Sequence, residues 1–109
     1  LTGLGNVISI GGKLEISYNN ILTGLTGLEG LTSIGGDLEI RDNPVLTSLT
    51  GLDNIVAGSI GNLSIYSNIS LVSCDVQSIC NYLVSPNGIV NIYHNESGCN
   101  NPPEIASAC

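Results

Sequence analysis

Apolar and polar residues follow a pattern that repeats along the first two thirds of the chain. The segment 10–16 (IGGKLEI) recurs 24 residues later at 34–40 (IGGDLEI), and a copy shorter by one residue begins at Ile60. Residues 14–16 alternate apolar, polar, apolar, as in a strand with one buried face. Leucines spaced three apart at 22–31 fit neither a continuous helix nor a strand. The pattern therefore predicts short strands joined by tight bends.

The repeated strands are expected to stack, because a single strand cannot bury its apolar face alone. Superposing the copies aligns two aliphatic columns and one asparagine column. The columns are Leu14, Leu38, Leu63 and Val90; Ile16, Ile40, Ile65 and Ile92; and Asn19, Asn43, Asn68 and Asn95. We expect parallel pairing about 4.8 Å apart, with the asparagines satisfying backbone groups where a turn ends each strand. The asparagine column is therefore interpreted as structural. The glycine pairs at 11–12 and 35–36 are expected to adopt positive φ at another corner.

These motifs resemble those of leucine-rich-repeat proteins. The form Ile-Gly-Gly-x-Leu-x-Ile-x-x-Asn, followed by Leu-x-x-Leu-x-x-Leu, is similar to the receptor L-domain branch and to secreted surface proteins of Bacteroidetes-type bacteria. The resemblance is close over residues 1 to about 72. It implies a right-handed, mainly β solenoid of about four coils of 24–27 residues each. It also implies an extracellular, cell-surface location.

Two regions are predicted from the change of pattern at Cys74. Residues 1–73 are expected to form the leucine-rich-repeat coils, and residues 74–109 a helical, disulfide-stapled C-terminal cap. Because Leu1 corresponds to Leu25 in the repeat, the chain is expected to begin within a coil. We expect either further coils upstream, as in a fragment of a longer array, or a partner that covers this end.

The C-terminal region predicts two helices and one last strand. Apolar residues spaced along 76–83 form one helical face, for which Ser73 is the expected N-cap. Residues 89–93 are expected to form the last strand. Pro102 is expected to open a second helix that acts as a short lid.

The four cysteines lie in the last third of the chain, at Cys74, Cys80, Cys99 and Cys109. An even number in a short chain predicts two disulfides and an oxidising compartment. A zinc site is the weaker reading, since His94 is the single histidine. Loop closure mildly favours Cys74–Cys80 and Cys99–Cys109. A Cys74–Cys80 bridge is impossible if both residues lie within one helix, so either Cys74 precedes the helix or the pairing is interlaced, and the connectivity stays open.

Composition and charge narrow the function classes. Two Lys and Arg against nine Asp and Glu give a net charge of −7, which argues against a nucleic-acid partner. Apolar runs are too short for a membrane-spanning helix. No catalytic, metal or cofactor site is predicted. His94 has no visible partners, and Glu15 and Glu39 should be adjacent on a flat face without a cleft. Ion pairs of Lys13 with Asp37 and Arg41 with Glu15 explain these charges more simply than a calcium site.

The outward side of the strands is the candidate binding face. One outward column is Ser17, Arg41, Tyr66 and Tyr93, with Glu15 and Glu39 beside it. Tyr and Arg are enriched at interface hot spots, although ordinary surface tyrosines explain the column equally well. We therefore expect a non-catalytic protein-binding or adhesion module. The alternatives are a carbohydrate-binding module and a structural stacking unit in a surface filament or secreted assembly.

Overall fold

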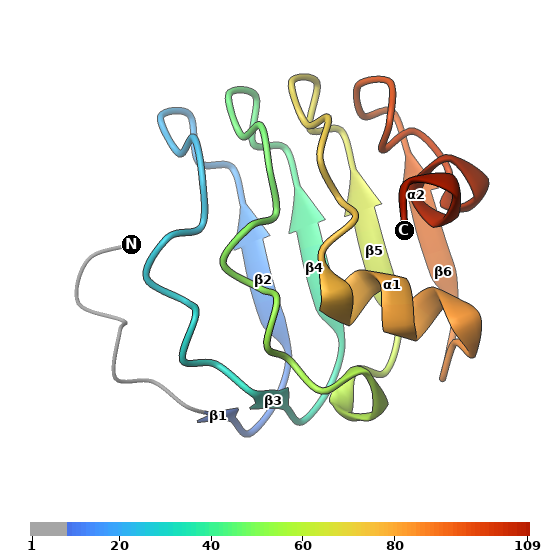
Figure 1. Ribbon diagram of the computed structural model, residues 1–109. Coiled ribbons are helices and arrows are strands. Elements are labelled where there is room, and N and C mark those ends of the chain that lie inside the picture. The colour runs from blue at the N-terminus through green and yellow to red at the C-terminus, as the bar shows by residue number, and fades with distance from the viewer. Residues whose placement is uncertain (1–8) are drawn as a thin grey trace.

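The computed structural model describes residues 9–109. Leu1, and with it the expected start within a coil, lies outside the described residues. Four strands come first along the described part of the chain, and helices alternate with the last two strands (Figure 1). The strands are β1 (Ser9–Ile10), β2 (Leu14–Ser17), β3 (Ser33–Ile34), β4 (Leu38–Arg41), β5 (Leu63–Tyr66) and β6 (Val90–Tyr93). The helices are the 3-10 helix η1 (Ala57–Ser59) and the α-helices α1 (Gln77–Val84) and α2 (Pro102–Ala108).

The four longer strands form one parallel sheet in the order β2-β4-β5-β6, and β1 pairs in parallel with β3. The register joins Leu14 to Leu38, Leu38 to Leu63 and Leu63 to Val90, and the isoleucines two residues later are joined in the same way. Both aliphatic columns predicted from the sequence are therefore confirmed. The last strand begins at Val90, one residue later than expected.

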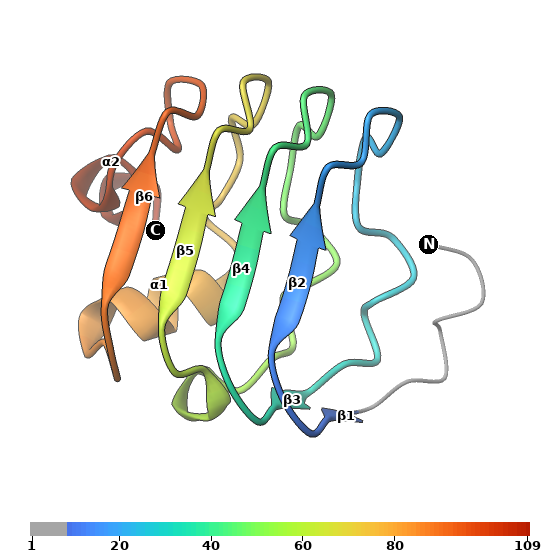
Figure 2. The same cartoon turned by 180° about the vertical axis from the view of Figure 1, so that it is seen from behind.

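The sheet forms one wall of the molecule, and the returning loops with α1 form the opposite wall (Figures 1 and 2). The leucines spaced three apart point between the walls, since Leu25, Leu28 and Leu31 are at most 3% exposed. Their backbone bends through i+3 hydrogen bonds, from Leu28 N to Leu25 O and from Leu31 N to Leu28 O. This geometry explains why the leucine spacing suits neither a helix nor a strand.

The asparagine column forms a continuous hydrogen-bonded ladder beyond the strand ends. The backbone N–H and Nδ2 of Asn19 both donate to Asn43 Oδ1, and those of Asn43 both donate to Asn68 Oδ1. Asn68 repeats the pattern on Asn95, at 3.1 Å for both bonds. Asn43 and Asn68 are fully buried. The predicted structural role of these residues is confirmed, because the ladder satisfies polar groups that would otherwise be buried without partners.

The glycine pairs do not have the backbone conformation expected from the sequence. Positive φ at glycine occurs instead at Gly27, Gly51 and Gly98 among the described residues. Gly35 is required for another reason: a Cβ there would lie 2.5 Å from the carbonyl oxygen of Gly11 in the preceding unit. The pair at 35–36 therefore allows close backbone approach between stacked units rather than a left-handed turn.

Helix α1 begins later than the sequence predicts. Ser73 is not its N-cap, since the helix starts at Gln77 after Val76, which makes no side-chain cap. Ser73 lies in a parallel bridge with Ser48, and its carbonyl accepts from Leu49 N at 2.9 Å. This extended backbone delays the helix by one turn.

The remaining C-terminal helix follows its prediction. α2 opens with Pro102, and the side chain of Asn101 caps it by accepting from the N–H of Glu104. Ile105 on this helix is fully buried against the rest of the core.

Two disulfides close the C-terminal region, Cys74–Cys99 and Cys80–Cys109. The near-neighbour pairing favoured by loop closure is therefore wrong, and the interlaced pairing is formed. Cys80 lies within α1, whereas Cys74 precedes it in an extended segment. The described chain is a small α/β domain of parallel strands, two short α-helices and two disulfides. None of the helices within residues 9–109 has the length and apolar character needed to span a membrane.

Candidate binding face on the sheet

The four residues of the predicted outward column lie side by side at the ends of the strands. The register pairs Ser17 with Arg41, Arg41 with Tyr66, and Tyr66 with Tyr93. Ser17, Arg41 and Tyr66 are partly exposed, and Tyr93 is 42% exposed. Parallel pairing thus brings together residues that are far apart in the chain, as predicted.

The two tyrosines of this column stack on each other. The ring centroids of Tyr66 and Tyr93 are 4.9 Å apart and the rings are only 9° from parallel. His94 contacts the Tyr93 ring edge-on, also with 4.9 Å between centroids. Partial burial raises the pKa of the Tyr66 hydroxyl, so this group stays protonated at neutral pH and can donate a hydrogen bond. Each tyrosine therefore has at least one ring face covered by a neighbour.

Arg41 is held in place by four neighbours. Its guanidinium carbon lies 4.7 Å from the centre of the Tyr18 ring, and Nη1 donates to the Tyr18 hydroxyl at 2.5 Å. Nε pairs with Glu39 Oε2 at 2.5 Å, and Nη1 pairs with Asp42 Oδ2 at 3.3 Å. A longer contact of 3.5 Å joins Nη2 to Glu15. The Tyr18 hydrogen bond and then Glu39 raise the pKa of Arg41, so the side chain is a fixed cation.

Lys13, the other cationic side chain, pairs with the same carboxylate, that of Glu39. Lys13 Nζ lies 2.7 Å from Glu39 Oε1 and 3.6 Å from Glu15 Oε1. The predicted Lys13–Asp37 pair is wrong, because Asp37 Oδ1 instead accepts from the backbone N–H of Asn62 at 2.8 Å. The Lys13 hydrogen bond lowers the pKa of Glu39 and correspondingly raises that of Lys13. Ion pairing thus occupies Glu15 and Glu39, and the predicted Arg41–Glu15 contact is present.

A further column of residues, not identified from the repeat pattern, sets the outline of this face. Each strand of the larger sheet is followed by a residue with φ between 54° and 57°, an uncommon conformation for residues other than glycine. These residues are Tyr18, Asp42, Ser67 and His94. They immediately precede the asparagine ladder, and that position in the repeat is the signal that could have marked them. The left-handed turn aims Tyr18 and Asp42 toward Arg41.

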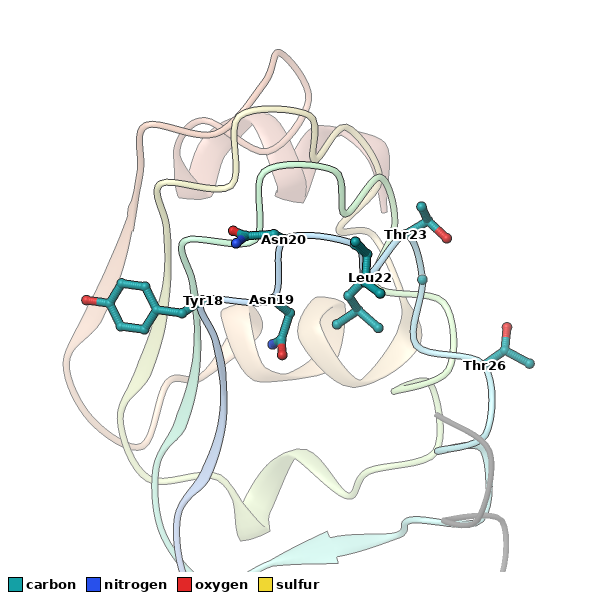
Figure 3. Close-up of a pocket in the computed structure, with 8 residues that line it drawn as sticks. Tyr18, Asn19, Asn20, Leu22, Thr23 and Thr26 are labelled. Atoms are coloured by element: carbon teal, nitrogen blue, oxygen red, sulfur yellow. The ribbon is translucent and has the colours of Figure 1, made fainter.

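Two hollows border this column. A groove of about 330 Å³ crosses three units and is lined by Tyr18, Asn20, Asp42, Pro44, Ser67 and Ile69. A larger one of about 620 Å³ lies at the end of the sheet formed by β2, and its lining includes Asn19, Leu22 and Thr23 (Figure 3). Figure 3 shows the Asn19 and Leu22 side chains pointing into the space between the walls, while Tyr18 points outward. The second hollow is therefore the uncovered end of the core within the described residues.

The carboxylates and the histidine of this face are already engaged by neighbouring side chains. Glu15 and Glu39 are bridged by the two cations, and His94 contacts an aromatic ring. Within the described range 9–109, no group of three or more His, Cys, Asp or Glu side chains is placed to hold a metal ion. Tyrosine and arginine, which are enriched at protein interfaces, are among the side chains that converge here.

Comparison of the chain with protein-family models, curated proteins and solved structures found no match.

Proposed function

We propose that this chain is a leucine-rich-repeat solenoid of the receptor L-domain type and serves as a non-catalytic protein-binding or adhesion module. The parallel register over units of 24 to 27 residues and the asparagine ladder support the solenoid assignment. The partner is a protein at the cell surface or in a secreted assembly. Two disulfides in a domain of this size support an extracellular location.

The row of planar side chains across the sheet carries the binding proposal. Tyr18, Arg41, Tyr66, Tyr93 and His94 follow one another across all four strands of the larger sheet. Stacking, a cation–π contact and the bond to Glu39 fix their orientation before any partner arrives. Less side-chain entropy is then lost on association, which is the advantage of a preorganised hot spot.

The geometry of the rings favours a protein partner over the alternative glycan. A sugar that stacks on an aromatic residue needs an uncovered ring face. Tyr66 and Tyr93 cover one face of each other, and His94 adds a contact to Tyr93. Stacking leaves at most one face of each ring for a sugar, whereas the hydroxyls and ring edges remain to contact a protein, as in the amphipathic use of tyrosine at protein interfaces.

The proposal is tested by affinity capture from envelope extracts of the source cells, with the intact chain as bait. We expect the variant Arg41→Ala/Tyr66→Ala/Tyr93→Ala to lose at least nine tenths of the captured partner. Val84→Ala is the matched control, because Val84 is 86% exposed on α1 away from the sheet face. Circular dichroism establishes that both variants are folded. Equal capture by the triple variant and the wild type would reject this face, and hits on a glycan array would favour the carbohydrate alternative.

A further inference from the structure

The turn between α1 and β6 contains the single Asn-Gly pair of the sequence, Asn87-Gly88. Every residue from Val84 to Ile89 is exposed to solvent. Asparagine is a thermolabile residue, because the backbone nitrogen that follows it can attack its side-chain amide. Glycine as the next residue leaves that nitrogen unhindered, since it has no Cβ and the backbone can rotate freely. The turn therefore carries a chemically labile site, separate from the candidate binding face.

The Asn87 side chain has a structural role in this turn. Its Nδ2 donates to the carbonyl oxygens of Ala57 at 3.2 Å and of Ile60 at 3.1 Å. Ala57 is the first residue of the 3-10 helix η1 and Ile60 follows the last. Asn87 thus ties the turn to the preceding unit. An amide offers two N–H donors for these two carbonyls, whereas an ionised carboxylate offers none.

Packing requires glycine at position 88. Gly88 is not among the glycines with positive φ, so the backbone conformation itself would allow another residue. A Cβ at this position would collide with Asn62 Oδ1 and lie 3.0 Å from the carbonyl oxygen of Gly61. Asn62 Oδ1 is held there because it accepts from the N–H of Ile89 at 2.9 Å. The stacking of one unit on the next therefore imposes both members of the labile pair.

We propose that Asn87 is a site of spontaneous deamidation that the folded turn protects. The Gly88 nitrogen loses its proton to solvent and attacks Asn87 Cγ, and the side-chain nitrogen takes up a proton and leaves as ammonia. Water then opens the resulting succinimide at one of its two carbonyls, which gives aspartate or isoaspartate at position 87. The leaving nitrogen must give up its bonds to Ala57 and Ile60 before it departs. The reaction is therefore slow while the turn is closed.

Neither product can restore the contacts that Asn87 makes. A carboxylate at position 87 would face the carbonyl oxygens of Ala57 and Ile60 with no N–H to donate to them. Isoaspartate also lengthens the main chain by one carbon just before β6, where the carbonyl of Ile89 accepts from Leu63 N at 2.9 Å. The modification therefore accumulates in chains whose turn has opened, and it weakens the turn further.

Peptide mass spectrometry of the intact chain during incubation at pH 8 and 37 °C tests the proposal. In guanidinium chloride, with the disulfides reduced and alkylated, we expect Asn87 to be the first asparagine to show the mass gain of an amide-to-carboxyl exchange. In the native chain we expect this site to react at least tenfold more slowly. Asn87→Gln is the control for the site, because a glutamine would have to close a larger ring and should show no gain over the same period.

Urea unfolding tests the structural consequence. Asn87→Asp reproduces the aspartate product. Asn81→Asp is the matched control, since it adds the same charge at an exposed position of α1 and keeps the oxygen that accepts from Gln77. We expect the urea midpoint of Asn87→Asp to fall at least twice as far as that of Asn81→Asp.

Three results would each overturn the proposal. The first is equal deamidation rates at Asn87 in the native and denatured chains. The second is faster reaction at another asparagine of the denatured chain, and the third is an equal fall of the urea midpoint in Asn87→Asp and Asn81→Asp. The rate comparison uses the wild-type chain, so it does not depend on whether either variant folds.

Discussion

Two glycines at equivalent positions of adjacent units allow a test of whether glycine is needed there for close packing or for backbone freedom. Gly35 and Gly11 occupy the same place in the repeat, yet only at Gly35 does a neighbouring unit leave no room for a Cβ. We expect Gly35→Ala to lower the free energy of unfolding by about 1–3 kcal/mol, the usual range for overpacking. Gly11→Ala meets no atom of residues 9–109 within 4 Å, and should leave stability unchanged or raise it by up to about 1 kcal/mol. Urea unfolding of both variants measures the difference, and equal effects would refute the close-approach explanation.

The asparagine ladder allows the same comparison between a buried and an exposed member. Asn43→Ala removes the acceptor for Asn19 and the donor to the Ile16 carbonyl, at a site with no solvent access. We expect a loss of about 2–4 kcal/mol, because buried groups are left without partners. Asn19→Ala lies at the exposed end and should cost about 1 kcal/mol or less. Thermal and urea unfolding of both variants test this ranking, and a larger loss for Asn19→Ala would contradict it.

At the scale of elements, one carboxylate connects β2 with β4. Glu39 on β4 holds Lys13, which precedes β2, and Arg41 on its own strand. Lys13 lowers the pKa of Glu39. A lowered carboxyl pKa contributes stability that is complete above the unfolded value of about 4.3 and is lost as the pH falls through the folded value. Urea midpoints between pH 3 and pH 6 should therefore fall more steeply on acidification in the wild type than in Glu39→Gln. If the urea midpoints of the two proteins fell equally on acidification, this contact would contribute nothing measurable to stability.

The strands could be predicted from the sequence because two independent signals agree there. The inside–outside alternation at Leu14–Ile16 identifies each strand, and the 24-residue period fixes which residues become neighbours. The candidate column of Arg41, Tyr66 and Tyr93 follows from that register alone. The contacts within it do not, because Lys13 can reach either Asp37 or Glu39 and the choice depends on side-chain rotamers. Lys13 pairs with Glu39 in the structure, because the Asp37 side chain instead accepts a hydrogen bond from the backbone N–H of Asn62.

The C-terminal elements were harder to predict because tertiary contacts overrule local preferences. Serine is a favoured N-cap residue, but pairing with the preceding unit keeps Ser73 extended. Loop-closure entropy changes slowly with length and therefore discriminates poorly between cysteine pairings. The repeat itself held a better signal, since Cys74 and Cys99 are separated by 25 residues, about one unit. Their disulfide joins positions in adjacent units.

The two disulfides differ in exposure and should therefore differ in reactivity. Cys74 and Cys99 are at most 1% exposed, whereas Cys109 is exposed at the chain end and Cys80 is partly buried. Reduction needs access of a thiolate or phosphine to a sulfur atom. Under limiting reductant in native buffer, we expect Cys80 and Cys109 to be alkylated before Cys74 and Cys99, as measured by peptide mass spectrometry. Labelling in the opposite order would show that the end carrying α2 is not the more accessible one.

For the whole molecule, the charge distribution sets the response to salt. Both cations are engaged by Glu39, while acidic residues such as Glu29, Asp53 and Asp75 carry charge elsewhere on the molecule. Exposed ion pairs contribute only up to about 1 kcal/mol each, so screening them costs little. Screening the repulsion that follows from a net charge of −7 favours the compact state.

We therefore expect the free energy of unfolding to rise between 20 mM and 500 mM NaCl, over which the screening length falls from about 20 Å to about 4 Å. Urea unfolding at a concentration where the chain is monomeric measures this effect without a contribution from self-association. Glu39→Gln is the informative control, because it removes the ion pairs and one negative charge together. A fall in stability with salt in the wild type that disappears in Glu39→Gln would mean that the paired cluster, rather than the net charge, dominates the electrostatics of the fold.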